Sequence, residues 1–315
     1  MILVCGEALF DFFHTAGGEP PARLNYQAVA GGSPFNVAIG LARLGVAASY
    51  LGGISNDVLG CHLVEVLTKE RVHLDYLQRF DAPTTLAMVA LDAEGTPQYD
   101  FRGVGCADRA LSCKQLPVLA PQVRTLHVGS FSLVVEPVGQ ALRELVARES
   151  SQRLISLDPN VRFNAQPDVQ AWRQHMETLV GHAHLIKASD EDLAALYPGA
   201  TFEAIAERWL KGPACQLVFV TRGAQGAQVF SRAHGQVAIE ATPIQMADTV
   251  GAGDTFQAAV LTWLTEHGFD TPSGLSRLQP AQLKALLKFA VAAAALTCSK
   301  VGPDLPYRHD LKDFA

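Results

Sequence analysis

Short apolar runs recur along this chain, and stretches with helical periodicity separate them. The runs are Ile2–Cys5, Thr125–Val128, Leu154–Leu157, His184–Ile186 and Leu217–Val220. Each run ends in polar or glycine residues, and most lead into a helix-like pattern. Continuous apolar runs of this length are typical of strands that are buried on both faces of a parallel sheet. The alternation therefore predicts an α/β fold, with helices on both faces of a parallel sheet.

Polar residues at the ends of these runs indicate one shared cleft. Asp158, Lys187, Ser189 and Thr221 lie at or just beyond the ends of predicted strands. Ligands of parallel α/β sheets bind beyond the carboxyl ends of the strands. We therefore expect these four residues to lie near one ligand.

The segment Asp248–Phe256 places a carboxylate at the beginning of a predicted helix. The amide groups of Gly251, Ala252 and Gly253 would face an anion there, because the first N–H groups of a helix have no partner within it. Asp254 would then take a proton from a hydroxyl that attacks a phosphoryl group. An ordinary capped helix accounts for these residues equally well.

A second glycine pair opens another predicted helix. Ser33 is the expected N-cap of this helix, and Gly45 closes it. Gly31 and Gly32 would bring the backbone close to a ligand, and Asn36 offers a donor and an acceptor to a polyol. A tight turn before a packing helix is the alternative interpretation.

Composition argues against several classes of partner. The 315 residues carry a net charge of −6, which is unfavourable for nucleic-acid binding. No apolar run reaches the roughly 18–20 residues that span a membrane, and no basic region of a signal peptide precedes the first strand. The six cysteines show no CxxC spacing, so we expect neither zinc nor disulfides. A cytoplasmic protein without a membrane partner is the prediction.

The two glycine-led motifs together resemble the ribokinase-like, or PfkB-type, carbohydrate kinases. The N-terminal motif corresponds to Gly31–Gly45 and the C-terminal motif to Asp248–Leu261. Further similarity lies at Gly6–Asp11, Leu157–Arg162, Lys187–Asp192 and Val220–Gly226, and thus extends over nearly the whole chain. The resemblance implies a single domain over residues 1–315. It also implies a three-layer α/β/α sandwich with a small β lid, formed by about 10–30 and 84–103.

The alternating pattern within the second of these lid segments predicts a β-hairpin. Thr85–Leu91 and Gln98–Phe101 are the expected strands, and Asp92–Gly95 is the turn. A lid makes physical sense for phosphoryl transfer, because it excludes water that would otherwise accept the phosphoryl group.

The resemblance implies roles around the sugar. Asp254 would be the general base, and the backbone of Gly251, Ala252 and Gly253 would stabilise the transferred group. The implied sugar-binding residues are Asp11, Gly31, Gly32, Asn36, Phe101, Arg102, Arg162 and Asp254.

Two arginines bear on the identity of the sugar. Arg102 and Arg162 stand near places where fructokinases and 2-keto-3-deoxygluconate kinases direct arginines toward the sugar. A surface or lid salt bridge is the alternative for both of them. Asp108 and Arg109 follow a Cys-Ala turn and are interpreted as structural.

The resemblance also implies ATP and Mg²⁺ as cofactors. The implied nucleotide-binding residues are Lys187, Ser189, Thr221, Gly223, Gly226, Gly253 and Val291. Asp192 departs from the Asn-x-x-Glu pattern of relatives, so we expect it to meet Mg²⁺ only through water. Ser189 fits an ordinary helix cap equally well. Asp248 is an implied ligand of a monovalent cation, potassium.

An ATP-dependent sugar kinase is therefore the predicted activity, with fructose as the favoured substrate. 2-Keto-3-deoxygluconate kinase is the nearest alternative, and ribokinase and nucleoside kinase fit less well. A non-catalytic sugar or nucleotide sensor would predict a damaged catalytic loop, whereas Asp254 and its glycines are intact. A dehydrogenase would need a Gly-x-Gly-x-x-Gly turn after the first strand, and that turn is missing. Relatives suggest a homodimer that forms through the lid.

Overall fold

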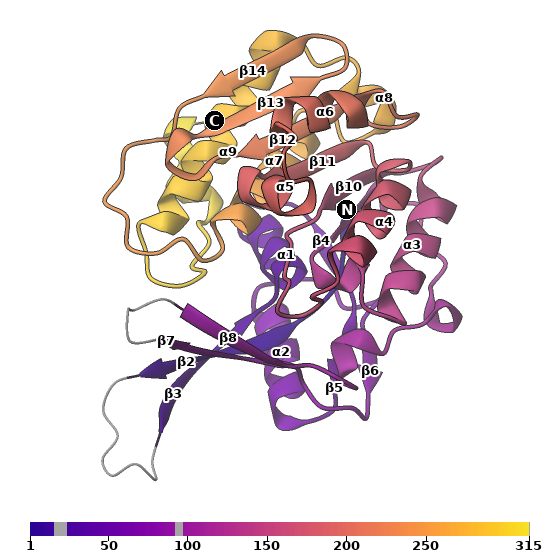
Figure 1. The fold of residues 1–315 in the computed structure, drawn as a ribbon, viewed down its shortest axis with the longest axis vertical. Coiled ribbons are helices and arrows are strands. Elements are labelled where there is room, and N and C mark those ends of the chain that lie inside the picture. The colour runs from indigo at the N-terminus through magenta and orange to yellow at the C-terminus, as the bar shows by residue number, and fades with distance from the viewer. Residues whose placement is uncertain (16–23, 92–96, 315) are drawn as a thin grey trace.

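The strands predicted from the short apolar runs lie side by side in one large sheet (Figure 1). The computed structural model describes residues 1–15, 24–91 and 97–314. In this part of the chain, the sheet has the order β14-β13-β12-β11-β10-β9-β1-β4. Its strands are β1 (Ile2–Cys5), β4 (Ala48–Leu51), β9 (Thr125–Gly129), β10 (Leu154–Asp158), β11 (Leu185–Ser189), β12 (Leu217–Thr221), β13 (Ala227–Ser231) and β14 (Gly235–Ile239).

Neighbouring strands from β4 to β12 run parallel, as predicted. Sequence patterns did not predict β4, β13 or β14. The last two are antiparallel and extend the sheet beyond β12. The sheet is therefore mostly parallel, with an antiparallel edge.

Alternate residues of the central strands face two separate cores. Ile2 and Val4 belong to one core, and Leu3 and Cys5 to the other, because successive side chains of a strand point to opposite faces. The first core is covered by α1 (Ser33–Arg43), α2 (Val58–Lys69), α7 (Ala252–Glu266) and α9 (Pro280–Cys298). The second is covered by α3 (Val138–Glu149), α4 (Val169–Val180), α5 (Asp190–Leu196) and α6 (Phe202–Leu210). The expected three-layer α/β/α sandwich is confirmed.

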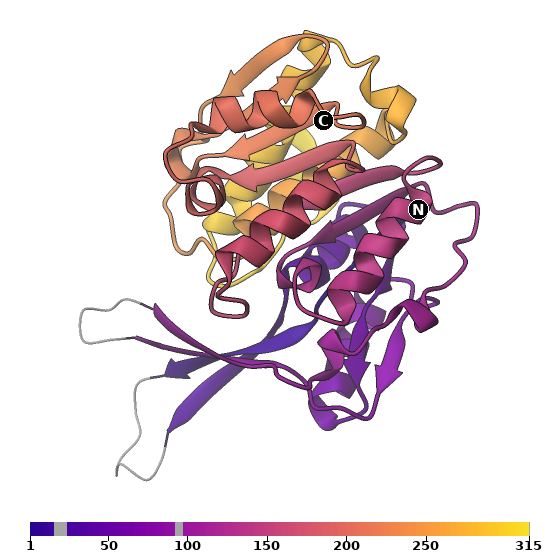
Figure 2. The ribbon, with the colours of Figure 1, turned by 45° about the vertical axis from the view of Figure 1, so that its right-hand side comes forward.

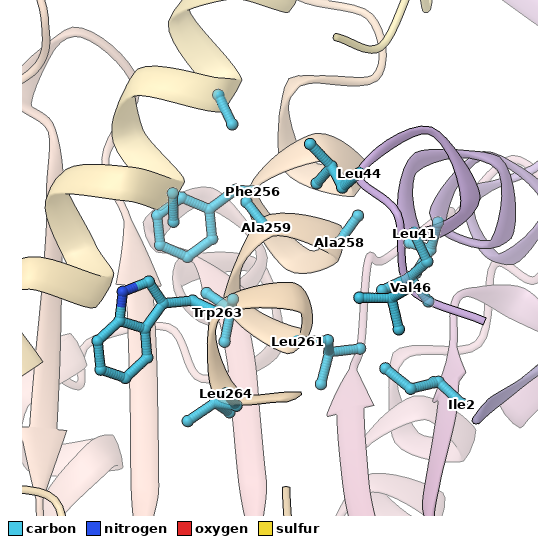
Figure 3. Close-up of a cluster of buried hydrophobic side chains, with 14 of the residues drawn as sticks. Ile2, Leu41, Leu44, Val46, Phe256, Ala258, Ala259, Leu261, Trp263 and Leu264 are labelled. Carbon is cyan, nitrogen blue, oxygen red and sulfur yellow. The ribbon is translucent and has the colours of Figure 1, made fainter. Parts of the chain in front are cut away.

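Helix α7 lies between α1 and α9 (Figure 3). Phe256 and Trp263 point from α7 toward α9, whereas Ala258 faces α1 and Leu261 points toward Val46 and Ile2. Gly40 of α1 permits a close approach, since a Cβ atom there would lie 2.8 Å from the Cβ atom of Ala258. This packing fixes the position of the first turn of α7, in which the predicted catalytic carboxylate lies.

A second sheet, here called the lid sheet, projects from the body of the molecule (Figures 1 and 2). Its order is β3-β2-β7-β8, from β2 (Leu9–Thr15), β3 (Asn25–Gly31), β7 (Leu86–Leu91) and β8 (Pro97–Arg102). Strands β7 and β8 form the predicted antiparallel hairpin, whose turn at 92–95 lies outside the described residues. Strand β2 pairs in parallel with β7 and so joins the two lid segments. A small pair, β5 (Gly53–Ser55) and β6 (Gln78–Phe80), lies apart from both sheets.

The length and composition of helix α9 differ from the prediction about membrane-spanning segments. By length and composition it is apolar enough to cross a membrane, so the prediction that no segment reaches this length is wrong for Pro280–Cys298. Core helices of soluble proteins pass the same test, and 56% of the apolar window of α9 is buried inside the structure. Packing against α7 accounts for its composition.

Candidate active site

Asp254 lies in the first turn of α7, and only 6% of its surface is exposed. Gly251 is the N-cap of this helix, with a left-handed φ of 78°. Glycine adopts this conformation without strain. A Cβ atom at position 251 would also lie 2.9 Å from the Pro303 Cβ atom. The turn that leads to Asp254 therefore requires a glycine at this position.

Side chains from two other segments hold the Asp254 carboxylate. Ser33 Oγ donates to Oδ1 at 2.7 Å, and Asn36 Nδ2 donates to Oδ2 at 2.8 Å. Asn160 Nδ2 lies 3.5 Å from Oδ1. Ser33 is the first residue of α1 and Gly32 is its N-cap, so the prediction of Ser33 as the N-cap is wrong. The Ser33 hydroxyl donates its hydrogen bond to Asp254 instead.

Sequence patterns missed Ser33 and Asn160 as site residues. Asn160 lies just beyond β10 with a left-handed φ of 38°, and Ser130, beyond β9, has a φ of 62°. The Ser130 N–H donates to the Asp158 carbonyl oxygen at 3.1 Å, so these two unusual conformations are adjacent. Such conformations cluster at functional sites. The only sequence signal was the location of Asn160 in a segment that resembles the kinases.

The amide groups at the start of α7 are not all free. The Ala252 N–H donates to the Thr249 carbonyl oxygen at 3.2 Å, so it is not available in the way predicted. Within the described residues, the amides of Gly251, Gly253 and Asp254 donate no hydrogen bond. These three N–H groups, rather than the predicted set, are available to an anion.

A buried cation lies beside these amides. Lys187, at 3% exposure, pairs with Asp158 at 2.9 Å. A Cβ atom on Gly253 would lie 3.0 Å from Lys187 Nζ. Burial opposes the charge on Lys187, but Asp158, Asp192 and Asp254 outweigh that effect and raise its pKa above the ordinary value. A protonated ammonium group therefore lies next to the anion-binding amides.

On the lid side, Asp11 of β2 approaches Gly31. A Cβ atom at Gly31 would lie 2.6 Å from Asp11 Oδ2, and one at Gly32 would lie 2.7 Å from the Glu7 carbonyl oxygen. Both glycines thus permit close approach of these protein atoms, and their close approach to a ligand stays a prediction. Burial raises the pKa of Asp11 to about 6, a net value in which the Arg162 charge opposes the rise and the Asp254 charge adds to it. Arg162 and Asp254 are therefore near enough to act on the Asp11 charge, although the exposed Arg162 side chain donates to the Val161 carbonyl oxygen at 2.9 Å.

Strand register in the lid sheet places Phe101 and Arg102, two predicted sugar-binding residues, on opposite faces of that sheet. Asp11 pairs with Ala87, which pairs with Phe101, so the three form one row across the lid sheet. Their side chains share a face, and Arg102 points to the opposite one. The Arg102 side chain is 70% exposed and forms an ion pair with Asp100 at 2.6 Å. The structure therefore brings Phe101 to the face of Asp11 but does not bring Arg102 there.

A cavity of about 450 Å³ lies beside the start of α7. Five predicted nucleotide-binding residues line it: Thr221, Gly223, Gly226, Gly253 and Val291. Sequence patterns missed its other lining residues, which include Ala241–Ile244, Met246, Phe256, Ala294, Ala295 and Cys298. Most of these side chains are apolar, which suits a flat aromatic base. Neither Lys187 nor Ser189 is among the lining residues.

Ser189 and Asp192 form a capping box at the start of α5. Ser189 Oγ accepts from the Asp192 N–H at 3.0 Å, and Asp192 Oδ2 accepts from the Ser189 N–H at 3.3 Å. Asp192 Oδ1 accepts from the Val161 N–H at 2.9 Å. Both carboxylate oxygens thus bind backbone groups, and the structural interpretation of Ser189 accounts for its contacts.

Asp248 connects the catalytic loop to the chain after α9. Its Oδ1 accepts from the N–H groups of Thr249 and Val250, at 2.6 and 3.1 Å. Its Oδ2 accepts from the Gly302 N–H at 2.8 Å. Because the carboxylate is engaged with backbone groups, it holds the two loops together.

The chain is similar to known proteins over nearly its whole length. The model of the pfkB family carbohydrate kinases matches residues 1–310. The fructokinase of Rhizobium leguminosarum bv. trifolii is 34% identical over 286 residues, which cover 90% of this chain and 86% of that protein. Fructokinase-1 of Zea mays is 34% identical over 317 residues, which cover 97% of this chain and 94% of that protein.

Solved structures are similar over almost the entire chain. Fructokinase from Xylella fastidiosa with bound ATP has a TM-score of 0.89 and 26% identity, covering 99% of this chain and 97% of that one. A double mutant of fructokinase from Vibrio cholerae O395, with fructose, ADP and potassium ion bound, has a TM-score of 0.81 and 26% identity. That similarity covers 99% of this chain and 97% of the other.

Proposed function

The chain belongs to the pfkB family of carbohydrate kinases and is a phosphotransferase that acts on a sugar hydroxyl; from this premise we propose that it is an ATP-dependent fructokinase. One observation carries the proposal. A buried carboxylate, free amides and a buried ammonium group meet at the start of α7, beside a cavity large enough for a nucleoside. Residues 1–315 would form one catalytic domain with the lid sheet over the sugar.

In the proposed reaction, Asp254 accepts the proton of the sugar hydroxyl. The hydroxyl oxygen forms a bond to the γ-phosphorus of ATP as the bond from that phosphorus to the bridging oxygen breaks, and ADP leaves with that oxygen. The amides of Gly253 and Asp254 and the ammonium group of Lys187 stabilise the charge on the transferred group. Ser33 and Asn36 keep the carboxylate oriented toward the hydroxyl.

The proposal assigns Mg²⁺ to the ATP phosphates and potassium to the loop near Asp248. Mg²⁺, when bound, neutralises charge on the ATP phosphates. Asp192 would reach it only through water, since both of its oxygens accept backbone hydrogen bonds. A potassium ion near Asp248 would need backbone carbonyl ligands, because this carboxylate is engaged with three N–H groups. If activity is unchanged when potassium is omitted, the proposed monovalent-cation site is wrong.

The preference for fructose rests on the relatives and on the arginines. The similar curated proteins are fructokinases at about one-third identity. Arg102, one of two arginines expected to hold an acidic sugar, lies on the far face of the lid sheet. Arg162 lowers the pKa of Asp11, so the negative charge of that carboxylate already offsets part of the positive charge of Arg162.

A substrate panel tests the proposal. Fructose, ribose, 2-keto-3-deoxygluconate and adenosine are each supplied with ATP and Mg²⁺, and ADP formation is measured. The highest kcat/KM is expected with fructose. A higher value with 2-keto-3-deoxygluconate would establish the nearest alternative, and the absence of turnover with every acceptor would favour a non-catalytic sensor.

Two further parts of the proposal concern the setting of the enzyme. We propose a cytoplasmic enzyme whose ligands are sugar and ATP, with no nucleic acid or membrane partner. We also propose a homodimer that forms through the lid sheet, because β3 and β8 are the outermost strands of that sheet in the described part of the chain, and outermost strands are where a second sheet can be added. Sedimentation of the full chain with and without fructose tests the dimer.

A further inference from the structure

Arg109 lies at the base of the lid sheet. It ends the 3-10 turn Ala107–Arg109, and its Cζ atom lies 5.3 Å from the centre of the Phe131 ring. A Cβ atom on Gly103 would lie only 2.3 Å from Arg109 Nη2 and 2.8 Å from its Cζ. The guanidinium group therefore fills the space in which a side chain at position 103 would begin.

This space is on the face of the lid sheet that carries Asp11. Asp11 and Phe101 belong to one row of the lid sheet and share its face. Gly103 is two residues beyond Phe101, and residues two apart in an extended chain lie on one side. Phe131 supports the same placement, because its ring contacts both Phe101, at 6.0 Å between centroids, and the Arg109 guanidinium.

Phe131 also links this group to the catalytic carboxylate. It is the second residue after β9 and follows Ser130, whose N–H donates to the Asp158 carbonyl oxygen. Two residues after Asp158, Asn160 reaches Asp254. Phe131 thus lies at the carboxyl end of β9, the strand next to the one that leads to Asn160, and its ring contacts Phe101 of the lid sheet.

The guanidinium group has no polar partner within the described residues. It makes no hydrogen bond and no ion pair, and its Nε atom is buried. The adjacent Asp108 forms no hydrogen bond or ion pair with it: Asp108 Oδ1 accepts from Thr85 Oγ1 at 2.5 Å, and Asp108 Oδ2 has no hydrogen-bond partner. The Arg109 charge still acts on this carboxylate, since it lowers the Asp108 pKa against the larger effect of burial. Arg43, by contrast, is bound by Glu70 and Asp304. A half-buried arginine with free donors has hydrogen bonds to offer to a ligand.

We propose that Arg109, and not Arg102, is the arginine that binds the acceptor sugar. Its planar N–H groups bind two adjacent oxygen atoms of the sugar, which are hydroxyls in a neutral ketose and a carboxylate in an acidic one. The Phe131 ring holds the guanidinium plane, and Gly103 leaves room for it. This inference rests on the proposed sugar-kinase function and adds a specificity-determining residue to it.

Steady-state kinetics of R109Q and R102Q test the assignment, with fructose and with 2-keto-3-deoxygluconate. R109Q is expected to raise KM for the accepted sugar by roughly tenfold or more, while KM for ATP changes less than about twofold. R109K should recover only part of the loss, because a lysine cannot bind two oxygens in a fork. R102Q should change either constant by less than about twofold.

The variant G103A provides an independent test. Its added methyl group would displace the guanidinium, which is the mobile end of a long side chain. G103A should therefore raise KM for sugar as R109Q does, and the double variant G103A/R109Q should be no worse than R109Q alone. Additive effects would overturn the proposal.

Other outcomes are also decisive. If R109Q has an unchanged KM for sugar and the wild-type enzyme turns over normally, the role of Arg109 is overturned and the proposed sugar-kinase function is not. Equal losses for sugar and ATP, with a lowered melting temperature, would make Arg109 a structural residue and also overturn it. Wild-type protein that phosphorylates no sugar would overturn both the proposed function and this inference.

Discussion

The hydroxyl group of Ser33 donates a hydrogen bond of 2.7 Å to Asp254, a residue 221 positions later in the chain. Asn36, one turn along the same helix, donates to the other carboxylate oxygen at 2.8 Å. The orientation of the proposed base is therefore set by α1, which packs directly against α7. We therefore expect the N-terminal glycine motif to contribute to catalysis as well as to sugar binding.

Removal of the Ser33 hydroxyl should slow the reaction without unfolding the protein. S33A deletes one hydrogen bond to a charged group, which is worth about 1.5–3 kcal/mol. We expect kcat to fall about tenfold or more, with KM for ATP unchanged. Steady-state kinetics and a thermal melt check this, with S276A as the control, because Ser276 is exposed and its hydroxyl donates to the Ser273 carbonyl oxygen. Normal turnover by S33A would show that α1 does not orient the base.

Asp254 itself should be indispensable for turnover. D254N keeps the size of the side chain and removes the proton acceptor, so kcat should fall by about 10²–10⁴-fold. ATP binding, measured by calorimetry, should persist, because the nucleotide cavity is separate from the carboxylate. Near-normal kcat in D254N would exclude Asp254 as the base.

The buried pair of Lys187 and Asp158 should couple stability to activity. K187M leaves the Asp158 carboxylate buried without its partner, and loss of one member of such a pair costs about 3–5 kcal/mol. The double variant K187M/D158N should recover much of the free energy of unfolding, measured by chemical denaturation. Its kcat should remain low, since the ammonium group beside Gly253 is absent. A double variant with wild-type kcat would remove Lys187 from the mechanism.

The nucleotide cavity should be closed by a larger side chain at Ala294. A294F places an aromatic ring among the apolar lining residues, so KM for ATP should rise about tenfold or more while KM for sugar is maintained. Ala147, an exposed alanine of α3, supplies the matched control A147F. Equal KM for ATP in both variants would mean that ATP binds elsewhere.

Glu7 should make the folded state less stable as pH rises. Burial raises its pKa to about 7, and hydrogen bonds from Ser132 and Ser130 only partly offset this effect. Between about pH 4.5 and 7 the unfolded chain has released this proton and the folded protein retains it, so stability falls with rising pH.

The variant E7Q tests this sign. The neutral amide oxygen still accepts from Ser132 Oγ, which lies 2.5 Å from Glu7 Oε2. The free energy of unfolding of wild-type protein should fall relative to that of E7Q by on the order of 3 kcal/mol between about pH 5 and pH 7.5. Parallel pH profiles of the two proteins would show that Glu7 has an ordinary pKa.

Local patterns predicted most of the elements around the site. The apolar runs marked β1 and β9–β12, because strands buried on both faces are continuously hydrophobic. Strand β14 was missed because it lies at an edge and its burial pattern is mostly exposed. Strand β13 was missed although most of its residues are buried. The four residues Ala48–Leu51 of β4 are all buried, but so short a run could not be told from part of a helix.

The sequence by itself determined the strand and helix pattern, the glycine turns and the carboxylate at the start of α7, because each depends on spacing and backbone freedom within a few residues. Only the tertiary structure decided that Ser33 binds Asp254, that Lys187 pairs with Asp158 and that Arg102 faces away from the site. Those relations depend on which helix packs on which strand and on sheet register. Such contacts join residues that are distant in the chain, so no local pattern encodes them.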